Sequence, residues 1–266
     1  MKRISECFNR LRHAKRTGLI TFITAGDPTI ESTLDFMHSL VKGGADIIEL
    51  GVPFSDPMAD GPIIQRSSER SLAAGTDLQS IFEVVRKFRL KDGETPIVLM
   101  GYMNPFEKAG FEKFAAEARK AGIDGLLIVD LPPEEATDEN AVLRANSIDQ
   151  IFLVAPNSST KRVTLIGNFA SGFVYFVSVK GVTGDKGISV DSIRNEVESA
   201  RSGVQLPIGV GFGIRTAKSA KEAAQVADAV VVGSALVEII EQNSGNGLAN
   251  DLLGDFVADL RSAVDV

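Results

Sequence analysis

Two carboxylates close together in the chain are the residues best suited to acid–base chemistry. Glu49 lies in the apolar run at residues 47–51, and Asp60 follows in a loop rich in proline and glycine. A carboxylate inside an apolar strand is costly to bury charged, so it either has a partner or holds a raised pKa. A structural ion pair for Glu49 and a turn role for Asp60 are the alternatives. Together, the two residues predict an acid–base pair, one on a strand and one on a loop.

A second group of residues has the composition of an anion site. Gly211 and Gly213 follow one apolar run, and Gly233 and Ser234 follow the next. Glycine lets backbone N–H groups approach an anion closely, and a helix that starts nearby favours negative charge. Each turn alone could be ordinary turn chemistry. Two such turns after consecutive runs predict a phosphate site.

Apolar and aromatic residues at or just past the ends of several runs are candidates for a pocket that accepts an aromatic ring. They are Phe22, Met100, Tyr102, Leu127 and Tyr175.

Eight short, β-branched apolar runs separated by helical patterns must position these groups. The runs are continuous rather than alternating, as expected for parallel strands buried on both faces. They predict a (β/α)8 TIM barrel, residues 1–266 forming a single domain, with a doubly wound open sheet as the alternative. The runs cover residues 19–23, 47–50, 97–100, 126–129, 151–154, 173–177, 208–210 and 229–232.

Two connections between the predicted strands are longer than the others. One carries residues 52–62 before the next helical pattern at 77–89, and the other carries residues 180–187. Both follow a strand's carboxyl end, the face where barrel enzymes hold their active sites. We therefore expect catalytic groups or a lid in these loops.

The composition excludes several other classes. One cysteine and two histidines among 266 residues argue against disulfides and against a His/Cys metal site. The net charge of −7 disfavours a nucleic-acid role, and no apolar run is long enough to cross a membrane. Residues 1–16 carry six basic residues and one acid. They predict an extra N-terminal helix packed on the barrel through Ile4, Phe8 and Leu11, with an organelle transit peptide as the alternative.

Over essentially its whole length the chain resembles the alpha subunit of tryptophan synthase. The most specific features are ELGVPFSDP at residues 49–57 and ADGP at 59–62. Further motifs are FITAGDP at 22–28, YMNP at 102–105, DLP at 130–132, GVTG at 181–184, GFGI at 211–214 and VGSA at 232–235.

The resemblance implies a cytoplasmic lyase that cleaves indole-3-glycerol phosphate to indole and glyceraldehyde 3-phosphate. It implies catalysis by Glu49 and Asp60, and no cofactor on this chain. It also implies a beta subunit that carries pyridoxal phosphate, receives indole and completes an alpha2-beta2 heterotetramer. The residues that it places around the substrate are Phe22, Tyr175, Thr183, Gly184, Phe212, Gly213, Gly233 and Ser234.

The chain departs from the resemblance at one position. Familiar members carry arginine where this chain has Val179, which bears on how the loop after the sixth strand is tethered. Two other functions fit the sequence less well. One is another phosphate-binding barrel enzyme, and the other is a subunit that mainly activates its partner.

Overall fold

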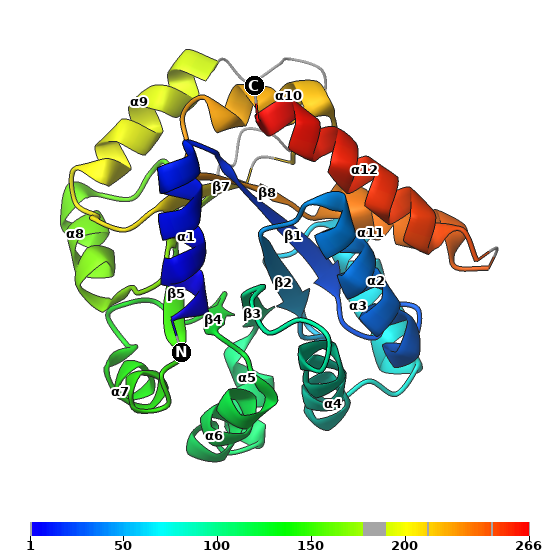
Figure 1. Cartoon of the computed structure of the whole chain (residues 1–266). Helices are drawn as coiled ribbons and strands as arrows, with labels where there is room; N and C mark the ends of the chain where they lie inside the picture. Colours follow the sequence, from blue (N-terminus) through cyan, green and yellow to red (C-terminus); the bar gives the residue numbers. More distant parts are fainter. Residues whose placement is uncertain (1, 178–189, 212, 246, 266) are drawn as a thin grey trace.

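Eight parallel strands close into a barrel in the computed structural model, which describes residues 2–177, 190–211, 213–245 and 247–265. Each strand pairs with the next, and β1 completes the ring on β8 with Gly18 opposite Ala229 (Figure 1). The predicted (β/α)8 barrel is therefore confirmed. The strands are β1 Gly18–Thr24, β2 Ile47–Gly51, β3 Ile97–Gly101, β4 Gly125–Ile128, β5 Asp149–Val154, β6 Val174–Val177, β7 Ile208–Gly211 and β8 Ala229–Val232.

Helices surround this ring of strands (Figure 1). They are α1 Arg3–Ala14, α2 Ile30–Gly43, α3 Pro62–Ala73, α4 Leu78–Arg89, α5 Met103–Lys108, α6 Phe111–Ala121, α7 Thr137–Ala145, α8 Thr160–Phe169, α9 Val190–Arg201, α10 Ala217–Ala224, α11 Ser234–Asn243 and α12 Ala249–Val264.

Alternate strand residues divide the apolar side chains into two layers. On β2, Ile47 belongs to a cluster inside the barrel, whereas Ile48 and Leu50 belong to the larger cluster between strands and helices. Successive side chains of a strand point to opposite faces. Glu49 therefore points into the barrel, just beyond Ile47 on the way to the carboxyl end.

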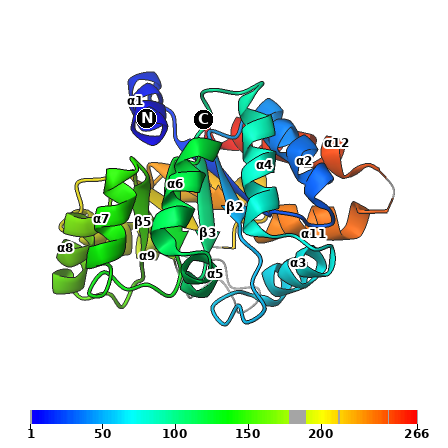
Figure 2. The same cartoon turned by 90° about the horizontal axis from the view of Figure 1, so that it is seen from below.

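Helix α1 covers the amino end of the barrel, as predicted from its apolar face. Ile4, Cys7, Phe8 and Leu11 are buried and join the interior cluster. The ring of Phe8 packs against that of Phe173, with centroids 5.8 Å apart. Figure 2 shows α1 at one end of the barrel and α3 and α5 at the other. Because α1 covers only the amino end, the carboxyl ends of the strands remain available for an active site.

Helices α3 and α5 are among those that the apolar pattern did not indicate. The buried residues of α3 are Ser67, Ser68 and Ser71, so the helix has no apolar stripe to reveal it. Helix α5 contains part of the YMNP motif, and of its six residues only Phe106 is buried. Helix α3 follows the long connection after β2, whereas only Tyr102 separates β3 from α5.

Candidate active site

Glu49 is completely buried on β2, in an environment that favours its protonated form. Within the described ranges neither of its carboxyl oxygens has a hydrogen-bond partner. Burial raises the pKa of Glu49 to about 8, so the group is mostly protonated at neutral pH. The ion-pair alternative is wrong for the part of the chain that the structure describes, because no cation there pairs with this carboxyl.

Two glycines make room for the aromatic side chains around Glu49. A Cβ atom on Gly211 of β7 would lie 2.8 Å from Cζ of Tyr175, and one on Gly51 would lie 2.6 Å from Cζ of Phe22. Burial and, after it, the charge of Glu49 raise the pKa of Tyr175. Tyr175 thus keeps its phenolic proton and lies within electrostatic reach of Glu49.

Asp60 lies in the loop between β2 and α3, where Tyr102 holds it. The Tyr102 hydroxyl donates to Oδ2 of Asp60 at 3.1 Å and accepts from the backbone N–H of Ala59 at 3.0 Å. The Tyr102 ring packs against Phe54, with centroids 5.3 Å apart. Partial burial raises the pKa of Asp60, and the Tyr102 hydrogen bond opposes that shift. The sequence placed Tyr102 in a pocket but gave no sign of this contact.

A cavity of about 580 Å³ lies beside Asp60 at the carboxyl end of the barrel, a size that fits a small organic substrate. A smaller hollow shares Asp60, Met100 and Val129 with it and adds Phe22 and Tyr102. The predicted Leu127 lines neither: it is fully buried in the barrel interior. The cavity is lined by Ala59, Asp60, Met100, Val129, Leu153, Ala155, Asn157, Ser158, Arg162, Tyr175 and Val177.

The candidate phosphate end lies at the start of α11. No side chain caps this helix at Gly233, so its first N–H groups have no side-chain acceptor there. Gly213 has a φ of 60°, a left-handed conformation that favours glycine. A Cβ atom on Gly233 would lie 3.3 Å from Cβ of Phe22, so this end adjoins the aromatic wall. Thr183, Gly184, Phe212 and Val179 lie outside the described residues.

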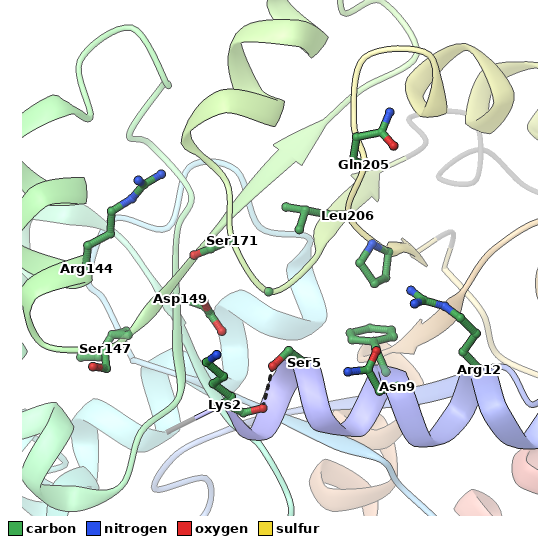
Figure 3. A pocket seen from close by; sticks show the side chains of 14 residues that line it. Lys2, Ser5, Asn9, Arg12, Arg144, Ser147, Asp149, Ser171, Gln205 and Leu206 are labelled. Atoms are coloured by element: carbon green, nitrogen blue, oxygen red, sulfur yellow. Dashed lines mark hydrogen bonds between the residues drawn. The ribbon is translucent and has the colours of Figure 1, made fainter.

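A larger cavity, of about 680 Å³, lies at the opposite end of the barrel and is not this site. Figure 3 shows it beside α1, with Lys2, Asn9 and Arg12 on one side and Arg144 and Asp149 on the other. It contains none of the residues predicted to act on a substrate. Chemistry in parallel barrels takes place at the carboxyl ends of the strands, which this cavity does not reach.

The described residues give little support to a metal or a membrane role. Within them, no cluster of three or more histidine, cysteine or acidic side chains could hold a metal ion. No helix among them is long and apolar enough to span a bilayer.

Comparison with known proteins relates the chain to one family. The sequence model of the tryptophan synthase alpha chain matches residues 8–254. A tryptophan synthase alpha chain from Burkholderia pseudomallei (strain 1106a) is 56% identical over 265 residues, which is all of this chain and 97% of that protein.

Solved structures agree. The tryptophan synthase alpha subunit from Legionella pneumophila superposes with a TM-score of 0.94 at 40% identity, covering 100% of this chain and 99% of that one. A chain of the tryptophan synthase complex from Pyrococcus furiosus has a TM-score of 0.84 at 38% identity, covering 93% of this chain and 99% of that one.

Proposed function

Because the chain belongs to the tryptophan synthase alpha chain family, we propose that Glu49 and Asp60 carry out its lyase reaction. That reaction is the retro-aldol cleavage of indole-3-glycerol phosphate to indole and glyceraldehyde 3-phosphate. The observation that carries the assignment is Glu49: a buried carboxyl with no described partner and a pKa raised to about 8. Such a group can both give and take a proton near neutral pH.

Glu49 first acts as the acid and then as the base. Its proton goes to C3 of the indole ring, which becomes an indoleninium cation. The bond between C3 and the glyceryl carbon then breaks, and its electron pair returns to the ring. The hydroxyl on that glyceryl carbon becomes the aldehyde and returns a proton to the Glu49 carboxylate. The proton balance closes without water or a cofactor.

Asp60 would stabilise the charge that develops in this reaction. Its carboxylate accepts the indole N–H and offsets the positive charge of the indoleninium ring. Tyr102 fixes its orientation through the 3.1 Å hydrogen bond to Oδ2. Phe22 and Tyr175 would enclose the indole ring.

The glycine turns would bind the other end of the substrate. The uncapped N-terminus of α11 at Gly233 and Ser234, with Gly213 in the turn after the neighbouring strand β7, is suited to a phosphate group. The family resemblance adds Thr183, Gly184 and Phe212 to this set. Phosphate binding far from the reacting carbon supplies orientation.

The family pairs with a beta subunit, and we extend the proposal to that assembly. We propose an alpha2-beta2 heterotetramer that passes indole to the beta subunit. The beta subunit would bind pyridoxal phosphate, and this chain would bind no cofactor or metal. Residues 1–266 would act as one domain, located in the cytoplasm.

An indole-release assay tests the catalytic assignment. Glu49→Gln should lower kcat by about 10²–10⁴-fold, because the amide neither gives nor takes the proton. Binding of inorganic phosphate, measured by calorimetry, should be unchanged. Glu94→Gln, an exposed glutamate in the turn before β3, is the matched control and should keep the wild-type rate.

Two results would contradict the proposal. A Glu49→Gln enzyme with near-normal turnover would remove Glu49 from the mechanism. A folded wild-type chain that releases no indole, with or without a beta subunit, would refute the lyase reaction itself.

A further inference from the structure

Helix α3 is attached to the barrel by hydrogen bonds rather than by apolar packing. The hydroxyl of Ser67 lies 2.6 Å from that of Thr24 at the end of β1, and the hydroxyl of Ser71 donates to the carbonyl of Ala25 at 2.5 Å. Hydrogen bonds are directional, whereas apolar contacts tolerate sliding. These hydrogen bonds therefore set both the position of α3 and its rotation about its own axis.

Arg70 lies on the same face of α3 and adds charged hydrogen bonds to this attachment. Its Nε and Nη2 donate to the two carboxylate oxygens of Asp27 at 2.7 and 2.8 Å, and its Nη1 donates to Oε1 of Glu241 at 2.7 Å. The Asp27 side chain is 1% exposed, so this bidentate contact is shielded from water. One guanidinium thus joins the loop after β1, helix α3 and helix α11.

Two of these elements, α3 and α11, adjoin the two ends of the candidate site. Helix α3 begins at Pro62, directly after the loop that carries Asp60. Helix α11 begins at Ser234, where the phosphate end lies. A substrate held at both ends requires a fixed separation between them.

We propose that Arg70 is a positioning residue that fixes Asp60 relative to the phosphate end of the site. The inference rests on the proposed function, since it gives Asp60 and Ser234 roles in binding one substrate. Arg70 itself does not touch the substrate. Its planar guanidinium donates to two carboxylates in different elements at once, a geometry that the ammonium group of lysine cannot reproduce.

Arg66 provides a matched control in the same helix. It forms two 2.7 Å hydrogen bonds to Glu241 but does not reach Asp27, and its side chain is 48% exposed. Removing it takes away a surface ion pair, which contributes little to stability, and leaves every contact of Arg70 in place. The variants to compare are therefore Arg70→Met, Arg70→Lys and Arg66→Met.

The kinetic test measures indole release by these variants. Arg70→Met should lower kcat by about 10²-fold, since small misplacements of a catalytic group have effects of this size. Arg70→Lys should recover part of the rate, and Arg66→Met should keep it. Inorganic phosphate binding should be preserved in all three. Wild-type kcat in both Arg70 variants would overturn the proposal.

A double-mutant cycle separates positioning from general stability. If Arg70 acts through Asp60, Arg70→Met should have little further effect on kcat in an Asp60→Asn background. Losses that multiply would overturn the proposal, because they would mean that Arg70 acts elsewhere.

Hydrogen exchange tests the inference without any activity. The Ala59 amide, which donates to Tyr102, should exchange faster in Arg70→Met and Arg70→Lys than in wild type or Arg66→Met. Unchanged exchange at residues 58–61 in both Arg70 variants would overturn the inference. A wild-type chain that releases no indole would instead refute the proposed function, and the exchange result would still decide the role of Arg70.

Discussion

Glu49 shows how one residue can trade stability for chemistry. A buried polar group without a hydrogen bond destabilises the fold, and an ionised one does so far more. The barrel reduces that penalty by keeping the carboxyl neutral, and burial raises its pKa to about 8. The same shift makes the group an acid at the pH where the reaction runs. Its position therefore serves the proposed reaction rather than the fold.

The pH dependence of stability should reveal how much the buried Glu49 carboxyl destabilises the fold. In the unfolded chain Glu49 ionises near the ordinary glutamate pKa of 4.5, whereas in the fold burial raises its pKa to about 8. The unfolded state thus releases this proton first, and the native state loses stability as pH rises between those values. Glutamine at position 49 cannot ionise. We expect the melting temperature of Glu49→Gln to exceed that of wild type by a margin that grows from pH 5 to pH 8.

Differential scanning calorimetry of both proteins across this range checks the prediction. The exposed Glu94→Gln variant should follow the wild-type curve at every pH. A constant difference between Glu49→Gln and wild type would show that Glu49 ionises alike in the folded and unfolded states.

Tyr102 is the residue through which the structure adds most to the sequence-based picture of the site. Its partner Asp60 lies 42 positions away, and no spacing rule links a strand-end tyrosine to an aspartate in a different loop. The strand pattern placed each residue at the carboxyl end separately. Their contact depends on how the β2–α3 loop folds back over β3, which apolar periodicity does not encode.

Removing the Tyr102 hydroxyl should loosen Asp60 while leaving the pocket packed. In Tyr102→Phe the ring keeps its contact with Phe54, but Oδ2 of Asp60 loses a donor and the Ala59 N–H loses its acceptor. A hydrogen bond to a charged group contributes about 1.5–3 kcal/mol, so kcat/KM should fall by roughly tenfold or more. Steady-state indole release measures kcat/KM of this variant. An undiminished value would show that Asp60 needs no hydrogen bond from Tyr102.

Among the elements, the strands could be predicted from their apolar runs, whereas helix α3 could not. All eight strands are continuous apolar runs, and their order along the chain already implied the barrel. Helix α1 was equally visible because Ile4, Phe8 and Leu11 share one face. Helix α3 escaped notice because serines replace the apolar residues on its buried face. The helix hidden by its serine-rich face thus lies beside the candidate site, directly after the loop that carries Asp60.

The residues of the site also divide into those that the sequence reveals and those that only the fold reveals. Glu49 stands out in sequence because it interrupts an apolar strand, and Gly233 because it separates a strand from a helix. Arg70 gives no such signal: it is one of several charged residues in α3, and only the fold brings it to Asp27 and Glu241. Polar networks between distant segments require the assembled structure.

At the scale of the whole molecule, the two ends of the barrel have separate tasks. The carboxyl end holds Glu49, Asp60 and the glycine turns, to which we assign the chemistry and the binding of substrate. The amino end holds α1 and ion pairs such as Arg3 with Asp124, at 2.7 Å with side chains only 11% and 2% exposed. In barrels of this type, residues at the amino end contribute mainly to stability.

Arg261 gives a test of that division. It donates to Oδ2 of Asp46 and to the carbonyl of Thr17, both at 2.8 Å, and so fastens α12 to the amino end of the barrel. Its side chain is 9% exposed, and Arg261→Met would leave the Asp46 carboxylate without its cation. Breaking a buried pair costs about 3–5 kcal/mol, so the free energy of unfolding in urea should fall by at least roughly 3 kcal/mol.

The same variant should turn over substrate normally wherever it is folded, because no contact of Arg261 reaches the carboxyl end. Arg16→Met is its control: Arg16 contacts Asp265, as Arg261 does, but its side chain is 42% exposed. Losing an exposed pair should cost less than about 1 kcal/mol. A lowered kcat in folded Arg261→Met would mean that strain passes along the strands to Glu49. An unchanged kcat alongside a large loss of stability is what a barrel with two independent ends requires.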